Sequence, residues 1–95
     1  MIRRLHTNLP NPFSEKTMIP FELSEESDVR LSLHLPDGEE VALITEARFG
    51  PGEHVVMFDA TGIPSGSYFY RLTAEGISRA RMLDIVHRSP SPESE

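Results

Sequence analysis

The sequence predicts an all-β protein folded as a two-sheet antiparallel β-sandwich of about six or seven strands. Apolar and polar residues alternate with a period of two in several short runs, which is the pattern of strands with one buried face. Turn residues separate these runs, and no window sustains the apolar period of an amphipathic helix. We therefore expect strands throughout the folded part of the chain.

The first half of the chain contains three predicted strands. Residues 17–23 and 29–35 alternate most clearly, and a Pro-Asp-Gly turn at 36–38 leads into a third strand at 41–44. Pro20 lies inside the first of these strands. Because proline cannot donate a hydrogen bond to a ladder, we expect that strand at a sheet edge or with a bulge.

Three further strands are predicted in the second half, at residues 54–59, 67–74 and 77–86. A loop at 48–53, which contains Gly-Pro-Gly, precedes the first of them. The last strand is apolar on both faces, and this pattern has two interpretations: packing within the core on both sides, or one face against a partner.

Length and composition indicate one domain, because 95 residues supply a single core. We expect an N-terminal arm at 1–10, the sandwich at 11–86 and a tail at 87–95. The tail is rich in Ser, Pro and Glu, so by itself it should be disordered.

The N-terminus carries no apolar run of the length that a signal peptide needs, and no stretch approaches the roughly 20 apolar residues of a membrane span. We therefore expect a free-standing cytoplasmic protein, with a place at the membrane surface compatible with its sequence. The alternative, if a leader has been removed, is the periplasm or the cell surface.

Charge and residue content argue against most chemistry. The net charge is −6, and nine acidic residues between Glu15 and Glu46 face only Lys16 and Arg30 in that segment, so nucleic acid binding is not expected. The acidic segment is either a solvated face or a docking surface for a basic partner.

Cysteine is absent, and no two of the four histidines are spaced to share one face of an element. Nothing in the sequence organises a nucleophile, a base and an orienting group around a pocket. We therefore predict no catalytic residue, no metal ligand, no cofactor and no small-molecule substrate: the protein is expected not to be an enzyme.

Several short motifs follow one another in a recognisable order. They are Asn11-Pro12-Phe13, Thr17 with Ile19, Phe21 and Leu23, Val29-Arg30-Leu31-Ser32-Leu33, Gly38-Glu39-Glu40-Val41, Gly52-Glu53-His54, Phe58-Asp59 and Gly66-Ser67-Tyr68-Phe69-Tyr70-Arg71-Leu72. In this order they resemble the immunoglobulin-like C-terminal sorting module of bacterial type IX secretion substrates, and equally the immunoglobulin-like domain of the flagellar hook-capping protein. The resemblance covers about residues 11–86 and implies an immunoglobulin-like sandwich.

These observations predict a non-enzymatic protein–protein interaction module, a small accessory or structural subunit that docks on a larger assembly through its outer sheet faces and tails. The resemblance implies an alternative role in sorting or surface attachment. The apolar and basic residues near the start can lie along a partner protein or beside an anionic membrane surface. The predicted partner contacts are Ile2, Arg3, Arg4, Leu5, Leu9, Met18, Met57, Phe69, Leu83 and Ile85.

Overall fold

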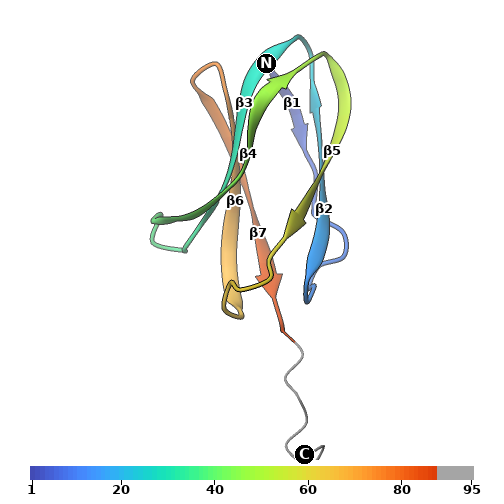
Figure 1. Cartoon of the computed structure of the whole chain (residues 1–95). Coiled ribbons are helices and arrows are strands. Elements are labelled where there is room, and N and C mark those ends of the chain that lie inside the picture. Colours follow the sequence, from blue (N-terminus) through green and yellow to red (C-terminus); the bar gives the residue numbers. More distant parts are fainter. Residues whose placement is uncertain (88–95) are drawn as a thin grey trace, which may run out of the picture.

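The computed structural model describes residues 1–87 and contains seven strands within them (Figure 1). The strands are β1 (Ile2–Leu5), β2 (Lys16–Leu23), β3 (Ser27–His34), β4 (Glu40–Phe49), β5 (Gly52–Asp59), β6 (Gly66–Ala74) and β7 (Ile77–Ile85). Every pairing between strands is antiparallel. The expected all-β antiparallel sandwich is confirmed. The part of the predicted tail beyond residue 87 lies outside the described residues.

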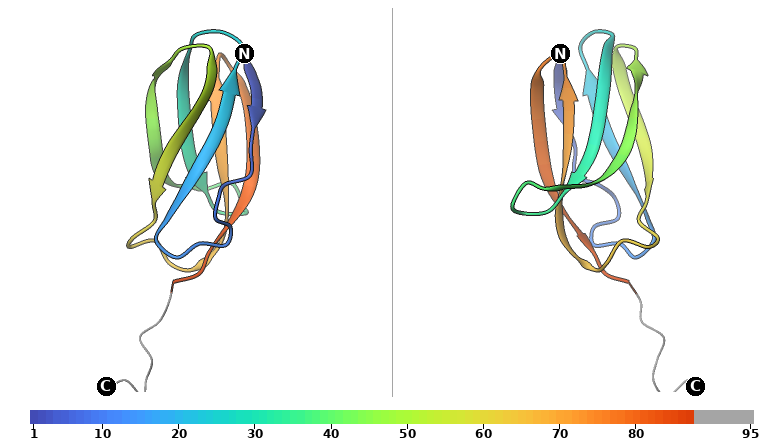
Figure 2. Two further views of the ribbon diagram at one scale, coloured as in Figure 1. Left: turned by 90° about the vertical axis from the view of Figure 1, so that its right-hand side faces the viewer. Right: turned by 60° about the vertical axis from the view of Figure 1, so that its left-hand side comes forward.

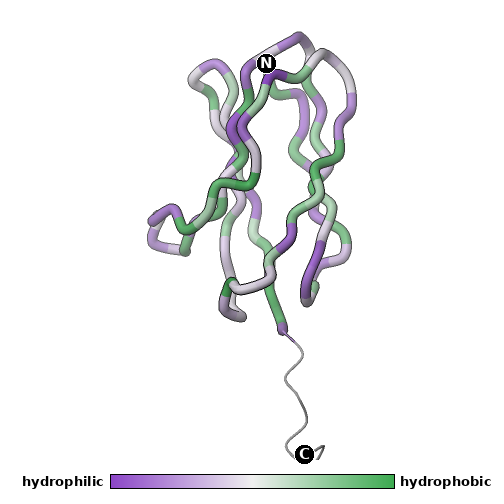
Figure 3. The backbone as a smooth tube through the Cα atoms, in the orientation of Figure 1, coloured by the Kyte–Doolittle hydropathy of each residue, from purple (hydrophilic) through white to green (hydrophobic). Residues whose placement is uncertain are grey.

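The strands form two sheets that pack face to face (Figure 2). One has three strands in the order β1-β2-β5, and the other has four in the order β4-β3-β6-β7. Apolar and polar residues alternate along the chain (Figure 3), so that each sheet turns one apolar face toward the other. The side chains buried between the sheets include Ile19, Phe21, Leu23, Val29, Leu31, Leu33, Tyr70, Leu72, Leu83 and Ile85.

The predicted N-terminal arm is instead strand β1. It pairs with β2, and the ladder has an irregularity between Ile2 and Arg4 that allows both Ile2 and Leu5 to face the core. Strict alternation would send these two residues to opposite faces, which is why the period-two pattern did not reveal a strand here. The sandwich therefore begins at Ile2 and not at residue 11.

The loop expected at 48–53 is mostly strand. β4 continues to Phe49 and β5 begins at Gly52, so only two residues connect them across the two sheets. Gly52 adopts a φ of 108°, a left-handed conformation that glycine reaches without steric strain. A short connection of this kind places β4 and β5 at the same side of the sandwich, as both views of Figure 2 show.

Pro20 was expected at a sheet edge or a bulge. It lies instead in a central strand, because β2 has β1 on one side and β5 on the other, and the register shift of the β1 ladder lies between Ile2 and Arg4 and not at Pro20. The β1 ladder ends where the missing N–H would be needed. The N–H of His6 still donates to the Pro20 carbonyl at 2.9 Å, but the His6 carbonyl receives no bond from Pro20. It accepts instead from the hydroxyl of Tyr70, at 2.5 Å, on the opposite sheet.

Tyr70 therefore fastens the N-terminal segment to the four-stranded sheet. Its hydroxyl also accepts a hydrogen bond from the backbone N–H of Asn8 at 3.0 Å. Burial raises the pKa of this hydroxyl above its ordinary value, so it keeps the proton that it donates. Tyr68 makes a similar contact, which we call the Tyr68 corner: its hydroxyl donates a hydrogen bond to the carbonyl of Pro64, in the loop before β6, at 2.6 Å.

Candidate functional site

The outer face of the three-stranded sheet carries a contiguous group of apolar side chains, all exposed except the half-buried Pro20. We call Leu9, Met18, Pro20, Val55 and Met57 the outer patch. Leu9 and Met18 form a backbone bridge, Met18 lies opposite Met57, and Pro20 lies opposite Val55. The exposed fractions are 58% for Leu9, 42% for Met18, 60% for Val55 and 58% for Met57, so these side chains lie largely in solvent. A patch of this kind on a sheet face is typical of interaction surfaces.

Charged residues border the outer patch at both ends. At one end Lys16 lies opposite Asp59, and at the other Glu22 lies opposite Glu53. A side-chain and a backbone hydrogen bond from Thr61 lower the pKa of Asp59. An apolar centre with a charged rim is the arrangement found at protein–protein interfaces.

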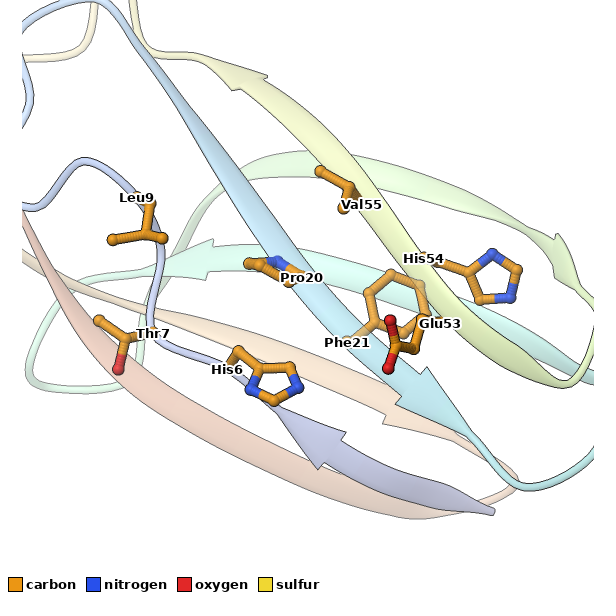
Figure 4. A pocket seen from close by; sticks show the side chains of 8 residues that line it. All are labelled: His6, Thr7, Leu9, Pro20, Phe21, Glu53, His54 and Val55. Atoms are coloured by element: carbon orange, nitrogen blue, oxygen red, sulfur yellow. The ribbon is translucent and has the colours of Figure 1, made fainter.

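An open depression of about 490 Å³ adjoins the outer patch (Figure 4). His6 and Thr7 lie on one side of it and Glu53, His54 and Val55 on the other, with Pro20 and Phe21 between them. The depression exists because the β1 ladder stops at Pro20, and the chain does not bridge to β2 again until Leu9.

The segment between the end of the β1 ladder and Leu9 is held by a buried side chain. Asn8 turns inward and is fully buried, donating its amide N–H to Thr17 Oγ1 and to the Pro10 carbonyl, each at 3.1 Å. Thr17 donates in turn to the same carbonyl at 2.8 Å. These bonds hold the segment that carries Thr7 and Leu9 on one wall of the depression, and Asn8 Oδ1 remains buried without a hydrogen-bond partner among the described residues.

The structure divides the predicted partner contacts into three groups. Leu9, Met18 and Met57 come together in the outer patch, and Arg3 and Arg4 are exposed on the neighbouring strand β1. Phe69 is half-buried on the outer face of the other sheet, opposite Met82. Four residues are buried in the core and so are not available to a partner: Ile2, Leu5, Leu83 and Ile85.

Sequence reasoning missed Pro20 and Val55 as members of the outer patch. The alternation of β5 contains the signal for Val55, because Val56 and Phe58 face the core and their odd-numbered neighbours face outward. The sequence predicts a sheet edge or a bulge at Pro20, and at an edge its ring would not join two neighbouring strands. Its membership follows only from the strand order.

The acidic segment lies mainly on the other sheet and its β3–β4 hairpin, and six of its nine carboxylates form ion pairs within residues 1–87. Arg30 binds Glu40 through two bonds of 2.7 and 2.8 Å, and its hydrogen bond lowers the pKa of that carboxyl group. Arg48 contacts Glu26 at 2.7 Å and Asp28 at 3.2 Å. Between the two interpretations of this segment, these pairs favour a solvated face, since basic partners are already supplied internally.

Ser32 and His34 form a hydrogen-bonded pair on the outer face of the four-stranded sheet. Ser32 Oγ lies 2.7 Å from His34 Nε2, and His34 Nδ1 lies 3.0 Å from the Gly38 carbonyl. A serine and an oriented histidine are the first two parts of a nucleophilic dyad. Here the residues are only 2% and 6% exposed, so a substrate does not reach the hydroxyl, and the pair instead ties β3 to the turn before β4.

Within residues 1–87, no cluster of three or more His, Asp or Glu side chains is placed to hold a metal ion. The same residues include no helix that is long and apolar enough to cross a membrane. Comparison with known proteins found no matching family model, no matching curated protein and no matching solved structure.

Proposed function

We propose that this chain is a non-enzymatic protein–protein interaction module, an accessory or structural subunit that binds a larger assembly through the outer face of its three-stranded sheet. The observation that carries the proposal is the outer patch: apolar side chains from three neighbouring segments, exposed together and surrounded by charge. The adjoining depression offers a place for one protruding side chain of the partner.

Two methionines on this surface suit such a role. Met18 and Met57 lie opposite each other, and unbranched thioether side chains adapt to partners of irregular shape. The exposed apolar area contributes nothing to the stability of the isolated chain. Its burial in a complex stabilises that complex by about 25 cal/mol per Å² removed from water.

A pair of matched variants tests this proposal. Met57→Lys places a charge in the outer patch. Met82→Lys makes the same substitution at a methionine of similar exposure (53%) on the opposite sheet. We expect affinity capture from native extract to recover the same partner with the wild type and Met82→Lys but not with Met57→Lys, at unchanged melting temperature. Equal recovery with both variants would contradict the assignment of the outer patch.

The second candidate function is a sorting or surface-attachment module of the type IX kind. The strand order, with β1-β2-β5 facing β4-β3-β6-β7, and the Tyr68 corner support an immunoglobulin-like arrangement. Fusion of residues 1–95 behind an exported reporter in a host that has the secretion machinery tests it. Surface display of the reporter is the expected result, and its retention in the periplasm rejects this candidate.

A further inference from the structure

Strand β5 has one edge with unpaired backbone groups, and the hydrogen-bond register shows which groups these are. Met18 exchanges backbone hydrogen bonds of 2.8 and 2.9 Å with Leu9, so its N–H and C=O face away from β5. Backbone groups alternate in direction along a strand. The odd-numbered residues of β2 therefore face β5, and they lie opposite the even-numbered residues of β5.

The N–H and C=O groups of Glu53, Val55 and Met57 consequently point away from β2. The bond from the Ala60 N–H to the Glu15 carbonyl, at 2.7 Å, continues the same alternation beyond the strand. In the described part of the chain, β5 has no strand on its other side and no backbone bond to β4.

This edge lacks several of the features that prevent strand pairing, and its charged residues, Glu53 and Asp59, lie toward its two ends. Natural edge strands carry proline, lysine or a bulge, or are very short. β5 has eight residues, no proline, no lysine and an unbroken register with β2 from Gly52 to Asp59. Its outward side chains at the centre, Val55 and Met57, are apolar.

The core is incompletely covered on the same side of the sandwich. The inward apolar residues of β3 and β6 are buried, whereas those that remain partly exposed come from β4, β5 and the loops beside them. They are Leu35, Ala42, Ile44, Phe49, Val56 and Ile63. An additional strand beside β5 would place its inward side chains against this part of the core.

We propose that β5 is a site of β-strand addition, and that its occupant is an extended segment of a partner protein running antiparallel to β5. This inference deepens the proposed function and rests on it. The segment has apolar side chains at alternate positions, facing Val56 and the core, and a basic residue at each end of its outward face. The basic residues lie opposite Glu53 and Asp59, which carry the exposed charges of the edge.

The observations favour a partner segment over a second copy of this chain. Self-pairing centred on Val56 would set Glu53 opposite Asp59 of the second copy, and like charges directly opposite destabilise a ladder. Self-pairing centred on Val55 avoids this contact but shortens the ladder. In both cases the net charge of −6 per chain repels, and the inward side chains of the second β5 already belong to their own core.

The probe is a synthetic peptide with acetylated and amidated ends, Lys-Val-Thr-Val-Thr-Val-Arg. In the antiparallel register its valines face the core, its threonines lie opposite Val55 and Met57, and its ends lie opposite Glu53 and Asp59. We expect amide exchange at Val55 and Met57 to slow by roughly tenfold or more at saturating peptide. Amides of the β4 edge should not change.

Two methylated peptides provide the matched control. N-methylation of both threonines removes the two central donors that face β5, and we expect it to abolish binding. N-methylation of the first two valines alters groups that face away from β5, and we expect it to weaken binding far less. Equal binding of the two peptides overturns the proposal.

Two variants of the full chain test the edge itself. Val55→Pro removes one free donor while leaving the bonds of Val56 to β2, and it should lose the peptide. Where its melting temperature shows that it does not fold, the double variant Glu53→Lys/Asp59→Lys replaces it. This variant should lose the basic peptide and bind one with glutamate at both ends, and failure of this charge exchange overturns the proposal.

The same variants separate this inference from the proposed function. If partner capture is lost with Met57→Lys but unchanged with Val55→Pro, the outer patch binds the partner and strand addition is rejected. A dimer in sedimentation with Val55 and Met57 protected without peptide also rejects it, in favour of a second copy.

Discussion

The outer faces of the two sheets differ in how many of their side chains are held by ion pairs and hydrogen bonds within the chain. On the four-stranded sheet, Arg30 and Arg48 neutralise carboxylates, and Ser32 bonds to His34. On the three-stranded sheet, the centre is occupied by apolar side chains that are between 42% and 60% exposed, together with the half-buried Pro20. The first face also has exposed apolar side chains, but they lie on its two edge strands, β4 and β7: Val41, Leu43, Ile77 and Met82. The second face gathers its apolar side chains on neighbouring segments, beside the edge of β5 described above. Function is therefore expected on the smaller sheet.

The largest expected effect is on the contact that joins the two sheets. Tyr70→Phe leaves the His6 carbonyl and the Asn8 N–H without their common partner, and we expect a loss of about 2–3 kcal/mol in the free energy of unfolding. Denaturant unfolding measures it. Tyr68→Phe, which removes one bond to Pro64, is the control and should cost about 1 kcal/mol. A smaller loss of unfolding free energy for Tyr70→Phe than for Tyr68→Phe would show that other contacts hold the segment of His6 and Asn8.

Ser32→Ala tests whether the hydrogen bond between Ser32 and His34, on the outer face of the four-stranded sheet, stabilises the fold. The substitution leaves His34 Nε2 buried without its partner, and about 1–2 kcal/mol of unfolding free energy should be lost. Thermal unfolding at neutral pH measures this loss. Unchanged stability would mean that water replaces the serine hydroxyl and that the face is less closed than its burial indicates.

The Arg30–Glu40 pair predicts a smaller, pH-dependent effect. The folded-state pKa of Glu40 is lowered from 4.5, so the pair stabilises the fold above that pH and the contribution disappears as the pH falls through the lower folded-state value. Arg30→Ala should therefore reduce stability at neutral pH and flatten its decline in acid. Because both side chains are exposed, the effect should shrink in high salt. The same acid dependence in the variant and the wild type would contradict this.

Met57→Thr should have the smallest effect on folding. The side chain is 58% exposed and Thr suits a strand, so we expect a change within about 0.5 kcal/mol, together with higher solubility. Chemical unfolding and light scattering measure the two quantities. A large loss of stability would mean that the outer patch contributes to the fold itself, and the contrast between the faces would fail.

Local patterning predicted six of the strands, because one alternating segment suffices to show a half-buried strand. It did not predict β1, whose bulge places Ile2 and Leu5 on the same side. It also misplaced Pro20, since the cost of a missing N–H depends on what lies beside it. Here the Tyr70 hydroxyl bonds the carbonyl that an N–H at position 20 would have served. That bond joins residues 64 positions apart in the chain.

The sequence by itself determined that this chain forms strands, which side chains share a face in the clearly alternating strands, and that Met18 and Met57 are candidates for exposure on an outer face. These are consequences of a two-residue repeat, which is a local property. Only the tertiary structure decided which strands are neighbours. Strand order brought Leu9, Met18, Pro20, Val55 and Met57 together, buried Leu83 and Ile85, and left one edge of β5 without a partner. Strand order is set by packing between segments that are distant in the sequence, and a local two-residue repeat contains no information about it.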